Sequence, residues 1–468
     1  MAKVLLILPH LPQRMGAPYL GQQYIAASLM TAGHTVKCLD MSALLYRGTD
    51  EDAVAEAERF GPDIVGMTLF TYNAARGYRL AHKLRHVARL IIAGGPHATV
   101  MPEEVVANGF DAAVVGEGEL VIRRIASMVD APRNLIDDLE GRLTTLAGVV
   151  TKAGAGPGSG FIDDLDELPF PYLSYPAFDP TVYSPNGTIS AGGLMTSRGC
   201  PARCTFCANY VTGRGYRFRS TENIIAEMVA LQKAHQLSNF PFWDDAFTAR
   251  RPRLNELCDG ILASPELEGA TWTCITPGNM VKPFDLERMR EAGCVAINFG
   301  LESGDYNVLK QIQKGQRPDQ VKAAVKAAKS AGMTTIVNFM FGFPGEGLVE
   351  LKNTLDLMVD LSDYTDFFNN RGVLVPFPGT AIYDDHVAAY GFAGWWLDPK
   401  NVKDEPNLFG LDVDAAFKAL EDDPTLELDF FRYSDPVREM IASCVAFKAR
   451  HNRRTLDRMS SGSTRQAA

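Results

Sequence analysis

The sequence predicts an α/β protein with three parts: a doubly wound, parallel, five-stranded sheet, then a partial (β/α)6 TIM-type barrel, then a helical carboxyl-terminal extension. Three observations support this prediction. The chain has 468 residues, too many for one ordinary hydrophobic core. Short apolar runs alternate with amphipathic segments in two successive series. A stretch rich in glycine and proline separates the two series.

The first series occupies residues 1–130. Strand-like apolar runs alternate with segments of helical spacing, which implies a parallel sheet covered on both faces. Loops at the carboxyl ends of such strands form a ligand crevice. The expected strands are 4–8, 35–39, 63–69, 89–93 and 111–115, and the expected helices are 21–32, 51–60, 74–87, 102–107 and 119–129.

Residues 131–188 have a different character. The apolar stretches 143–151 and 161–162 around the turn-rich segment 153–160 predict a hairpin. The prolines between 163 and 185 indicate an extended linker. We therefore expect the domain boundary in this stretch.

The second series occupies residues 189–385. Strands that alternate with helices predict an open barrel, with active residues at the carboxyl ends of its strands. The expected strands are 194–197, 240–243, 271–276, 296–300, 335–341 and 372–375, and the expected helices include 221–235, 285–292, 318–331 and 346–361.

The remainder, residues 386–468, is expected to be helical. Trp395, Trp396 and Phe431 are its predicted aromatic anchors. Its basic end, from Lys448 to Arg465, is interpreted as a solvated helix end and a frayed terminus.

Composition and missing motifs exclude several classes of protein. The net charge is −10 and no basic cluster stands out, which argues against a nucleic-acid partner. No apolar run reaches the roughly 18 residues of a membrane span, and no signal peptide is recognised, so we expect a cytoplasmic protein without a membrane partner. No Gly-x-Gly-x-x-Gly follows the first strand and no Gly-Lys-Ser/Thr loop exists, which disfavours dinucleotide binding and NTPase activity.

Three of the eight cysteines are crowded into one loop. Cys200, Cys204 and Cys207 follow the first predicted barrel strand in the spacing C-x3-C-x2-C. Three thiolates on a tight loop can hold three irons of a cubane cluster and leave the fourth iron for a small molecule that binds through amino and carboxylate groups. The alternative is a structural zinc site, which needs a fourth ligand, and no Cys or His lies nearby in sequence. The other five cysteines are interpreted as small buried hydrophobes: Cys38, Cys258, Cys274, Cys294 and Cys444.

This spacing, with an aromatic residue before the last cysteine, resembles the signature of the radical SAM superfamily. The segments 242–247, 298–304, 339–346 and 376–380 are similar to the corresponding strand ends of cobalamin-dependent radical SAM enzymes. The resemblance implies a 4Fe–4S cluster on the three cysteines. It also implies S-adenosylmethionine (SAM) on the fourth iron, cleaved by one electron to a 5′-deoxyadenosyl radical.

The resemblance also implies contacts to SAM outside the cysteines. Carboxylates at the barrel mouth would bond ribose hydroxyls or the ammonium group, and a backbone group would meet adenine. A solvated side chain is the alternative for Arg219, and a helix cap is the alternative for Asp244 and Asp245. The residues assigned to SAM are Phe206, Glu302, Ser303, Asn338, Arg219 and Asp244.

Loops of the first domain resemble those of the cobalamin-binding domain that precedes a subset of radical SAM barrels. The usual Asp-x-His-x-x-Gly segment is absent, because the chain reads Leu-Pro-His10 at that place. No cobalt ligand is assigned, and for His10 or His97 an ordinary loop histidine is the alternative to an axial ligand. The family pattern places residues near Leu69 beneath the lower face of the corrin. The residues assigned to cobalamin are Thr68, Leu69, Thr71, Gly94, Gly95, His97, Gly116, Glu117 and Gly118.

The implied function is methylation of an unactivated carbon of a small molecule, a specialised metabolite or cofactor precursor, by way of the deoxyadenosyl radical and methylcobalamin. An external electron donor of the flavodoxin or ferredoxin type is implied as partner. One alternative uses the same cofactors for ring contraction, cyclisation or oxidation. Another, from a different class, is a non-catalytic corrinoid sensor or carrier.

Overall fold

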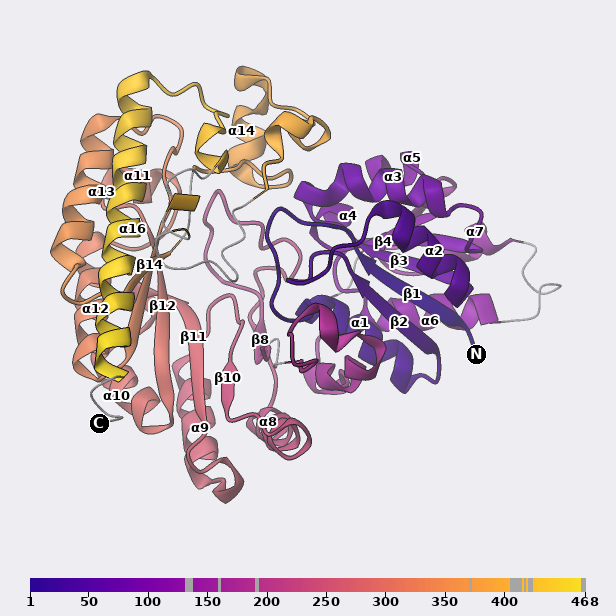
Figure 1. The fold of residues 1–468 in the computed structure, drawn as a ribbon, viewed down its shortest axis with the longest axis horizontal. Helices are drawn as coiled ribbons and strands as arrows, with labels where there is room; N and C mark the ends of the chain where they lie inside the picture. The colour runs from indigo at the N-terminus through magenta and orange to yellow at the C-terminus, as the bar shows by residue number, and fades with distance from the viewer. Residues whose placement is uncertain are drawn as a thin grey trace.

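The computed structural model describes residues 1–130, 138–158, 161–189, 193–369, 373–404, 415, 418–419 and 424–463. An amino-terminal α/β domain and a larger α/β half lie side by side, and the segment around α14 lies at the top of the view, between the two (Figure 1). The predicted fold class is confirmed.

The amino-terminal sheet has the strand order β2-β1-β3-β4-β5-β6-β7. Its first five members are parallel, in the 2-1-3-4-5 order of doubly wound domains. Such a sheet has its switch point between β1 and β3, where loops diverge and leave a crevice. The parallel strands are β1 (Lys3–Leu8), β2 (Thr35–Asp40), β3 (Ile64–Thr68), β4 (Leu90–Gly94) and β5 (Ala112–Val114).

Helices cover both faces of this sheet. Successive strand residues point to opposite faces, so Leu5 and Ile7 belong to one hydrophobic core while Val4 and Leu6 belong to another. The first core contains buried residues of α2, α3 and α5, and the second those of α1 and α6. The helices are α1 (Leu20–Thr31), α2 (Asp50–Phe60), α3 (Ala74–Leu84), α4 (Pro96–Val100), α5 (Pro102–Ala107), α6 (Glu119–Asp130) and α7 (Leu139–Leu143).

A hairpin is present, but it is shorter than predicted: its second strand lies within the predicted turn segment, and residues 161–162 form no strand. Its strands β6 (Val149–Thr151) and β7 (Gly154–Ala155) add antiparallel to β5. The prediction of an extended linker after it is wrong. Residues 165–182 form three short 3-10 helices, η3 (Leu165–Glu167), η4 (Pro171–Ala177) and η5 (Pro180–Val182). They pack on the domain because Phe178 and Tyr183 are buried in its core. The exact domain boundary stays a prediction.

The second half contains a five-stranded parallel sheet in the order β10-β11-β12-β13-β14. Along β11 and β13, half-buried and fully buried residues alternate. The buried positions, such as Val337 and Phe339, share a core with the outer helices, so the half-buried positions face the barrel interior. The strands are β10 (Asn239–Pro241), β11 (Thr271–Pro277), β12 (Cys294–Glu302), β13 (Thr334–Phe339) and β14 (Phe367–Asn369). The helices are α8 (Thr221–His235), α9 (Arg251–Ala263), α10 (Pro283–Glu291), α11 (Tyr306–Gln311), α12 (Pro318–Ser330) and α13 (Leu348–Leu361).

The outermost predicted strands differ from the observed ones. The last barrel strand is Phe367–Asn369, which pairs with β13, and not the predicted 372–375. Within that predicted range, residue 372 lies outside the described residues and Val373 makes only a single bridge to Phe341. The first predicted barrel strand is reduced to one bridge between Leu194 and Phe242. The chain then enters a separate antiparallel ribbon, β8 (Ser197–Arg198) with β9 (Arg217–Phe218).

The carboxyl-terminal region is helical, as predicted, with α14 (Ala381–Tyr390) and the long α16 (Asp435–Ser463). The interpretation of its basic end as solvated is wrong at Lys448, which is buried. The helix α16 lies against the edge strand β14, where the Asn452 side chain donates to the carbonyl of Phe368 and accepts from its amide. This pairing satisfies an edge that would otherwise expose backbone groups. The predicted frayed end beyond residue 463 lies outside the described residues.

Candidate active site

The three crowded cysteines lie on one loop held at its base by the β8–β9 ribbon. Gly199 opens the loop with φ +89°, and a Cβ there would lie 2.2 Å from the carbonyl oxygen of Gly215. Only glycine accepts this turn without moving the backbone. The Cys200 amide then donates to the Gly213 carbonyl at 3.2 Å. The loop is therefore a defined hairpin, and it carries its thiols beyond the β8–β9 ribbon, where the first barrel strand was predicted to end.

Burial and mutual repulsion disfavour the thiolate forms of these cysteines. Desolvation raises the pKa of Cys207 to about 12, with Cys204 and Asp245 adding to the shift, although its side chain is at the surface. Desolvation also raises the pKa of Cys200 and of Cys204. A group of positive charge bound at these sulfurs would relieve the repulsion.

No three His, Cys, Asp or Glu side chains among the described residues gather closely enough to hold a single metal ion. The described residues therefore form no evident site for one isolated ion. A cubane cluster does not require such convergence, because each thiolate binds a different iron.

A buried ion pair lies beside the cysteines. The Lys314 ammonium is 2.8 Å from Oε1 of Glu302, and it lies over the Phe206 ring at 5.6 Å from its centroid. Glu302 has φ +72° and sits at a register shift of β12, a backbone state that non-glycine residues rarely adopt. Its second oxygen, Oε2, is buried without a partner. Lys314 was missed in the sequence because it lies in the loop between α11 and α12, where no pattern marks it.

Two asparagines point polar atoms into the barrel interior. Asn338, at a half-buried position of β13, has a buried Oδ1 without a partner, and so does Asn298 on the neighbouring β12. Asn298 was not among the predicted contacts. Ser303 differs, since its hydroxyl is within 3.2 Å of Thr354 Oγ1 and accepts from the Asp305 amide.

Asp244 and Arg219 support the loop from behind. Asp244 is buried and accepts from the amide of Thr196 at 2.7 Å and from the hydroxyls of Thr196 and Ser197. Arg219 is also buried and pairs with Glu227, so a solvated arginine is wrong. These bonds occupy both side chains with protein partners, and their contact with SAM stays a prediction.

The helix-cap alternative for the two aspartates is wrong. The next helix, α9, begins after Arg250 and has no side-chain cap. Asp245 instead accepts from Thr212 Oγ1 at 2.8 Å and from the Gly199 amide at 3.3 Å. It therefore bonds both arms of the cysteine hairpin.

The residues predicted for cobalamin lie where β3, β4 and β5 end, as expected for a crevice at the carboxyl edge. A Cβ added to Gly94 would meet no protein atom within 4 Å, whereas one on Gly95 would lie 2.9 Å from the Leu69 carbonyl oxygen. The backbone at Gly94 is thus open to a close approach. Gln22, at the start of α1, is buried with neither amide atom partnered, and no pattern in the sequence marked it.

His97 is a packed core residue. It is fully buried, with Nε2 2.8 Å from the Tyr78 hydroxyl and 3.3 Å from Glu104 Oε1. Trp396 of the carboxyl-terminal region donates to the same Glu104 oxygen. The contacts of His97 therefore fit an ordinary packed histidine better than an axial ligand of cobalt.

His10 is held by a neighbouring arginine. Its Nδ1 lies 2.7 Å from Arg76 Nη1. Burial lowers the pKa of His10 to about 4, with Arg14 and Arg76 adding to the shift, so its imidazole is neutral at pH 7.

Glu117 joins the two halves of the molecule. Its carboxylate accepts two bonds of 2.8 Å from Arg217 and lies 3.2 Å from Arg198. Arg198 also bonds Glu119 at 2.6 Å. Because both arginines belong to the β8–β9 ribbon, the loop after β5 is fastened to the base of the cysteine loop.

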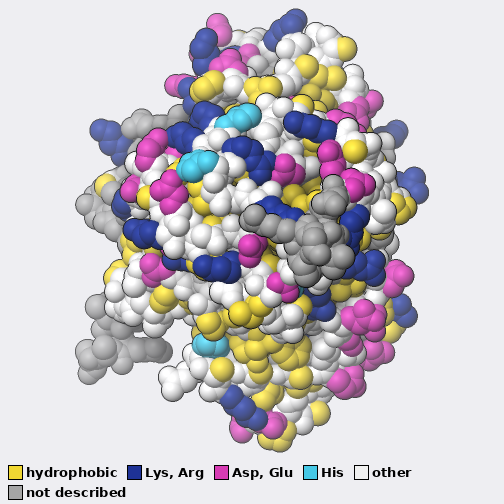
Figure 2. Space-filling view, turned by 90° about the vertical axis from the view of Figure 1, so that its right-hand side faces the viewer, with side chains coloured by type: hydrophobic (Ala, Val, Ile, Leu, Met, Phe, Trp, Pro, Cys, Tyr) yellow, Lys and Arg dark blue, Asp and Glu magenta, His cyan; other side chains and the backbone are white. Residues whose placement is uncertain are grey.

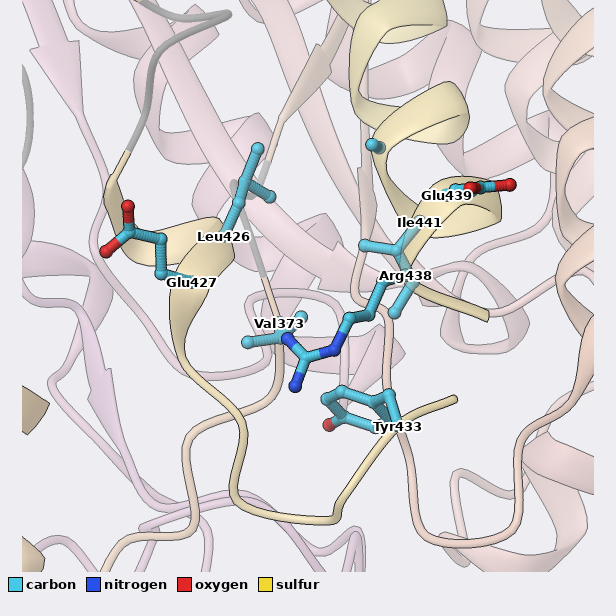
Figure 3. A pocket seen from close by; sticks show the side chains of 8 residues that line it. Val373, Leu426, Glu427, Tyr433, Arg438, Glu439 and Ile441 are labelled. Carbon is cyan, nitrogen blue, oxygen red and sulfur yellow. The ribbon is translucent and has the colours of Figure 1, made fainter. Parts of the chain in front are cut away.

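Two hollows lie near the barrel. One, of about 380 Å³, lies between the start of α16 and the segment after β14, where Arg438 extends toward Val373 and Tyr433 (Figure 3). The other, of about 670 Å³, lies beside the cysteine loop and is lined by residues of 201–203, 279–280 and 306–320. We call the second one the cationic groove, because its charged lining residues are Arg203, Lys310, Lys314 and Arg317.

Family models match both halves of the chain. The model of the radical SAM superfamily matches residues 194–358, and that of the B12 binding domain matches residues 16–126. An uncharacterized methyltransferase of Pyrococcus horikoshii is 31% identical over 398 residues, which cover 82% of this chain and 83% of the relative. The cytidylyl-2-hydroxyethylphosphonate methyltransferase of Streptomyces wedmorensis is 30% identical over 396 residues, 72% of each chain. The anaerobic magnesium-protoporphyrin IX monomethyl ester cyclase of Rubrivivax gelatinosus is 26% identical over 380 residues, 79% of this chain and 67% of the relative.

Solved structures share the fold. The radical SAM methyltransferase TsrM of Kitasatospora setae, with cobalamin and a [4Fe-4S] cluster bound, has a TM-score of 0.65 and 18% identity, over 84% of this chain and 76% of that one. The cobalamin-dependent SAM radical enzyme OxsB has a TM-score of 0.64 and 18% identity, over 84% of this chain and 56% of that one. At this identity the likeness establishes the common architecture.

Proposed function

Because the chain belongs to the radical SAM enzymes that carry an amino-terminal B12-binding domain, we propose that it is a C-methyltransferase that acts on an unactivated carbon of a small molecule. Its cofactors are a 4Fe–4S cluster, SAM and cobalamin. The observation that carries the proposal is the junction of Glu117 with Arg198 and Arg217, which ties the edge of the B12-binding domain to the cysteine loop. With this junction in place, the two cofactor sites would face each other across the substrate.

The residues of the barrel fit a cluster and SAM. Cys200, Cys204 and Cys207 would ligate three irons. Oε2 of Glu302 is a buried carboxylate oxygen without a donor, and an amino N–H of SAM would supply one. Lys314 would place a positive charge near the carboxylate of SAM. Asn338 would accept from a ribose hydroxyl, and the Phe206 backbone would meet adenine. When bound, these groups supply the radical that removes hydrogen from the substrate.

The B12-binding domain fits cobalamin through backbone and shape. Gly94 lets a flat ligand approach the end of β4. The Leu69 side chain, by contrast, is fully buried in the core against Gly77 of α3, so only its backbone would border a ligand there. Thr68 ends β3, and Gly116 and Gly118 follow β5, so they would border the same ligand. When bound, cobalamin supplies the methyl group that is transferred.

The reaction products test this function. Reconstituted, oxygen-free enzyme with a reductant, SAM and cobalamin should form 5′-deoxyadenosine and S-adenosylhomocysteine in parallel on a methyl-accepting substrate. The second product comes from the SAM molecule that gives up its methyl group. Deoxyadenosine without S-adenosylhomocysteine would reject methylation and favour a cyclisation, ring contraction or oxidation. A chain that consumes no SAM at all would return the corrinoid carrier as the better interpretation.

The cluster ligands can be tested separately. Replacing Cys204 with Ala should remove most of the bound iron and all deoxyadenosine formation. Cys38→Ala is the matched control, because this buried cysteine of β2 lies in the other domain and its loss should leave the iron content unchanged. Equal iron in both variants would contradict the assignment of Cys204.

The setting of the enzyme follows from its chemistry. We infer a cytoplasmic location, supported by eight free cysteines, which suit a reducing compartment. No helix in the described part of the chain has the length and apolar character to cross a bilayer. We infer a small-molecule substrate, no nucleic-acid partner, and an external one-electron donor of the flavodoxin or ferredoxin type.

A further inference from the structure

We propose that the cationic groove is the docking site of the electron donor, a small acidic one-electron carrier protein. This inference rests on the proposed function, because a donor is needed only if the cysteine loop holds a cluster. In the transfer, one electron leaves the reduced carrier, which is oxidised, and the cluster gains it; no bond forms or breaks.

The groove is joined directly to the cysteine loop. Pro201, Ala202 and Arg203, which line one side, lie between Cys200 and Cys204. On the other side, the Ile312 carbonyl accepts from the amide of Thr205 at 3.0 Å, which attaches the segment after α11 to the loop between two cysteines. A protein seated in the groove would thus approach the cluster as closely as the loop allows. Short distance is what electron transfer between proteins requires.

The charge of the groove is of one sign. Four cationic side chains line it, and no Asp or Glu is among the described residues that line it. Arg203 and Lys310 are both exposed and have no ion-pair partner among the described residues, whereas Lys314 is paired with Glu302 and Arg317 with Asp319. The chain as a whole has a net charge of −10, and on the face that the amino-terminal domain presents, acidic and basic side chains are interspersed (Figure 2). The groove is therefore a local positive site on an acidic protein.

A basic patch of this kind fits an acidic carrier. Complementary charge steers encounter and raises association rates more than final affinity, which suits a carrier that must leave after one electron. Electron-transfer contacts are also small, below about 1,200 Å², so a short groove with a few charges suffices. Lys314 connects the two environments, since it lines the groove and reaches Glu302 beside the cysteines.

Charge reversal on the reconstituted full chain tests the docking site. The variants are Lys310→Glu, on the exposed side of α11, and its combination with Arg203→Glu. The control is Lys152→Glu, an exposed lysine in the β6–β7 turn, which forms no ion pair within the described part of the molecule. The rate of cluster reduction is followed by stopped-flow absorbance with reduced flavodoxin, and separately with reduced methyl viologen, a small cation. Binding of labelled flavodoxin gives a second readout.

The double variant should be reduced by flavodoxin at least about tenfold more slowly at low salt and bind it more weakly, while methyl viologen reduces it no more slowly than the parent. Added salt should slow the parent enzyme and shrink the difference. Lys310→Glu alone should show a smaller effect in the same direction, and it leaves the cysteine loop intact. Unchanged flavodoxin rates in both variants, or equal slowing with methyl viologen, would overturn the docking site while leaving the proposed function standing. A parent enzyme that holds no iron would overturn both.

Discussion

The two ligand edges of this molecule are built in different ways. At the edge of the B12-binding domain, the polar side chains of Thr71, His97 and Glu117 already have protein partners, and Gln22 is the exception. At the barrel mouth, Glu302 keeps a buried oxygen unpartnered, as do Asn298 and Asn338. Buried polar atoms without partners are costly. The difference indicates that the first edge binds through shape and backbone, and the second through charge and directed hydrogen bonds.

The junction between these edges should show the largest effect. Arg198→Met removes the cation between Glu117 and Glu119 and leaves Glu119 buried without its arginine. Loss of one partner of a buried ion pair costs about 3–5 kcal/mol of stability. Urea unfolding of the full chain measures the loss.

Arg85→Met is the control for this variant. Arg85 also pairs with a carboxylate, that of Asp111, but the pair is largely solvent-exposed. Such a pair contributes at most about 1 kcal/mol. Equal losses in the two variants would mean that the junction is no stronger than a surface pair, and the two edges would not be held in register by it.

The second largest effect is expected at the barrel mouth, as a loss of affinity for SAM. Glu302→Gln keeps the shape of the side chain but removes the negative charge that would face SAM. Charge-assisted bonds contribute about 1.5–3 kcal/mol, so the Kd of SAM should rise roughly 10- to 100-fold. Isothermal titration on the cluster-loaded protein measures it, with Glu287→Gln, an exposed carboxylate of α10, as control. An unchanged Kd would show that the free oxygen of Glu302 serves another purpose.

The cysteine loop could be predicted from the sequence, whereas the contacts that join it to other parts of the chain could not. The cysteine loop was predictable because its chemistry lies in eight consecutive residues, and the alternation of strands places that loop at a barrel mouth. Lys314 was not predictable, since its link to Glu302 arises only when the segment after α11 folds back on β12. The junction was not predictable for the same reason, since Glu117 and Arg217 are 100 positions apart in the sequence and meet only in the folded chain. The last barrel strand was misplaced because apolar residues occur on both sides of 370, and only pairing with β13 decides between them.

Two buried carboxyl groups extend the comparison to pH. Asp40, in the B12-binding domain, accepts from Tyr183 and from the Ser42 amide; burial raises its pKa to about 6. Glu346, after β13, accepts from two backbone amides with one oxygen while the other has no partner; burial raises its pKa to about 7. Both carboxyl groups are therefore protonated in the folded protein over a pH range in which they ionise in the unfolded chain.

The pH dependence of stability should follow Glu346 at the barrel mouth. Its folded pKa lies above the unfolded value of about 4.5, so the folded state binds more protons between these values, and stability falls as pH rises from about 5 to above 7. The loss should be on the order of 1–2 kcal/mol, and Glu346→Gln should flatten it because the amide carries no charge at any pH in this range. Urea midpoints of the parent and variant at pH 5, 6, 7 and 8 measure the difference. Asp40→Asn is the comparison variant: burial raises the pKa of Asp40 to about 6, so this variant should change the pH dependence mainly between about pH 4 and 6 and keep the fall in stability above pH 6. If Asp40→Asn instead removed the fall above pH 6, Glu346 would not be its source.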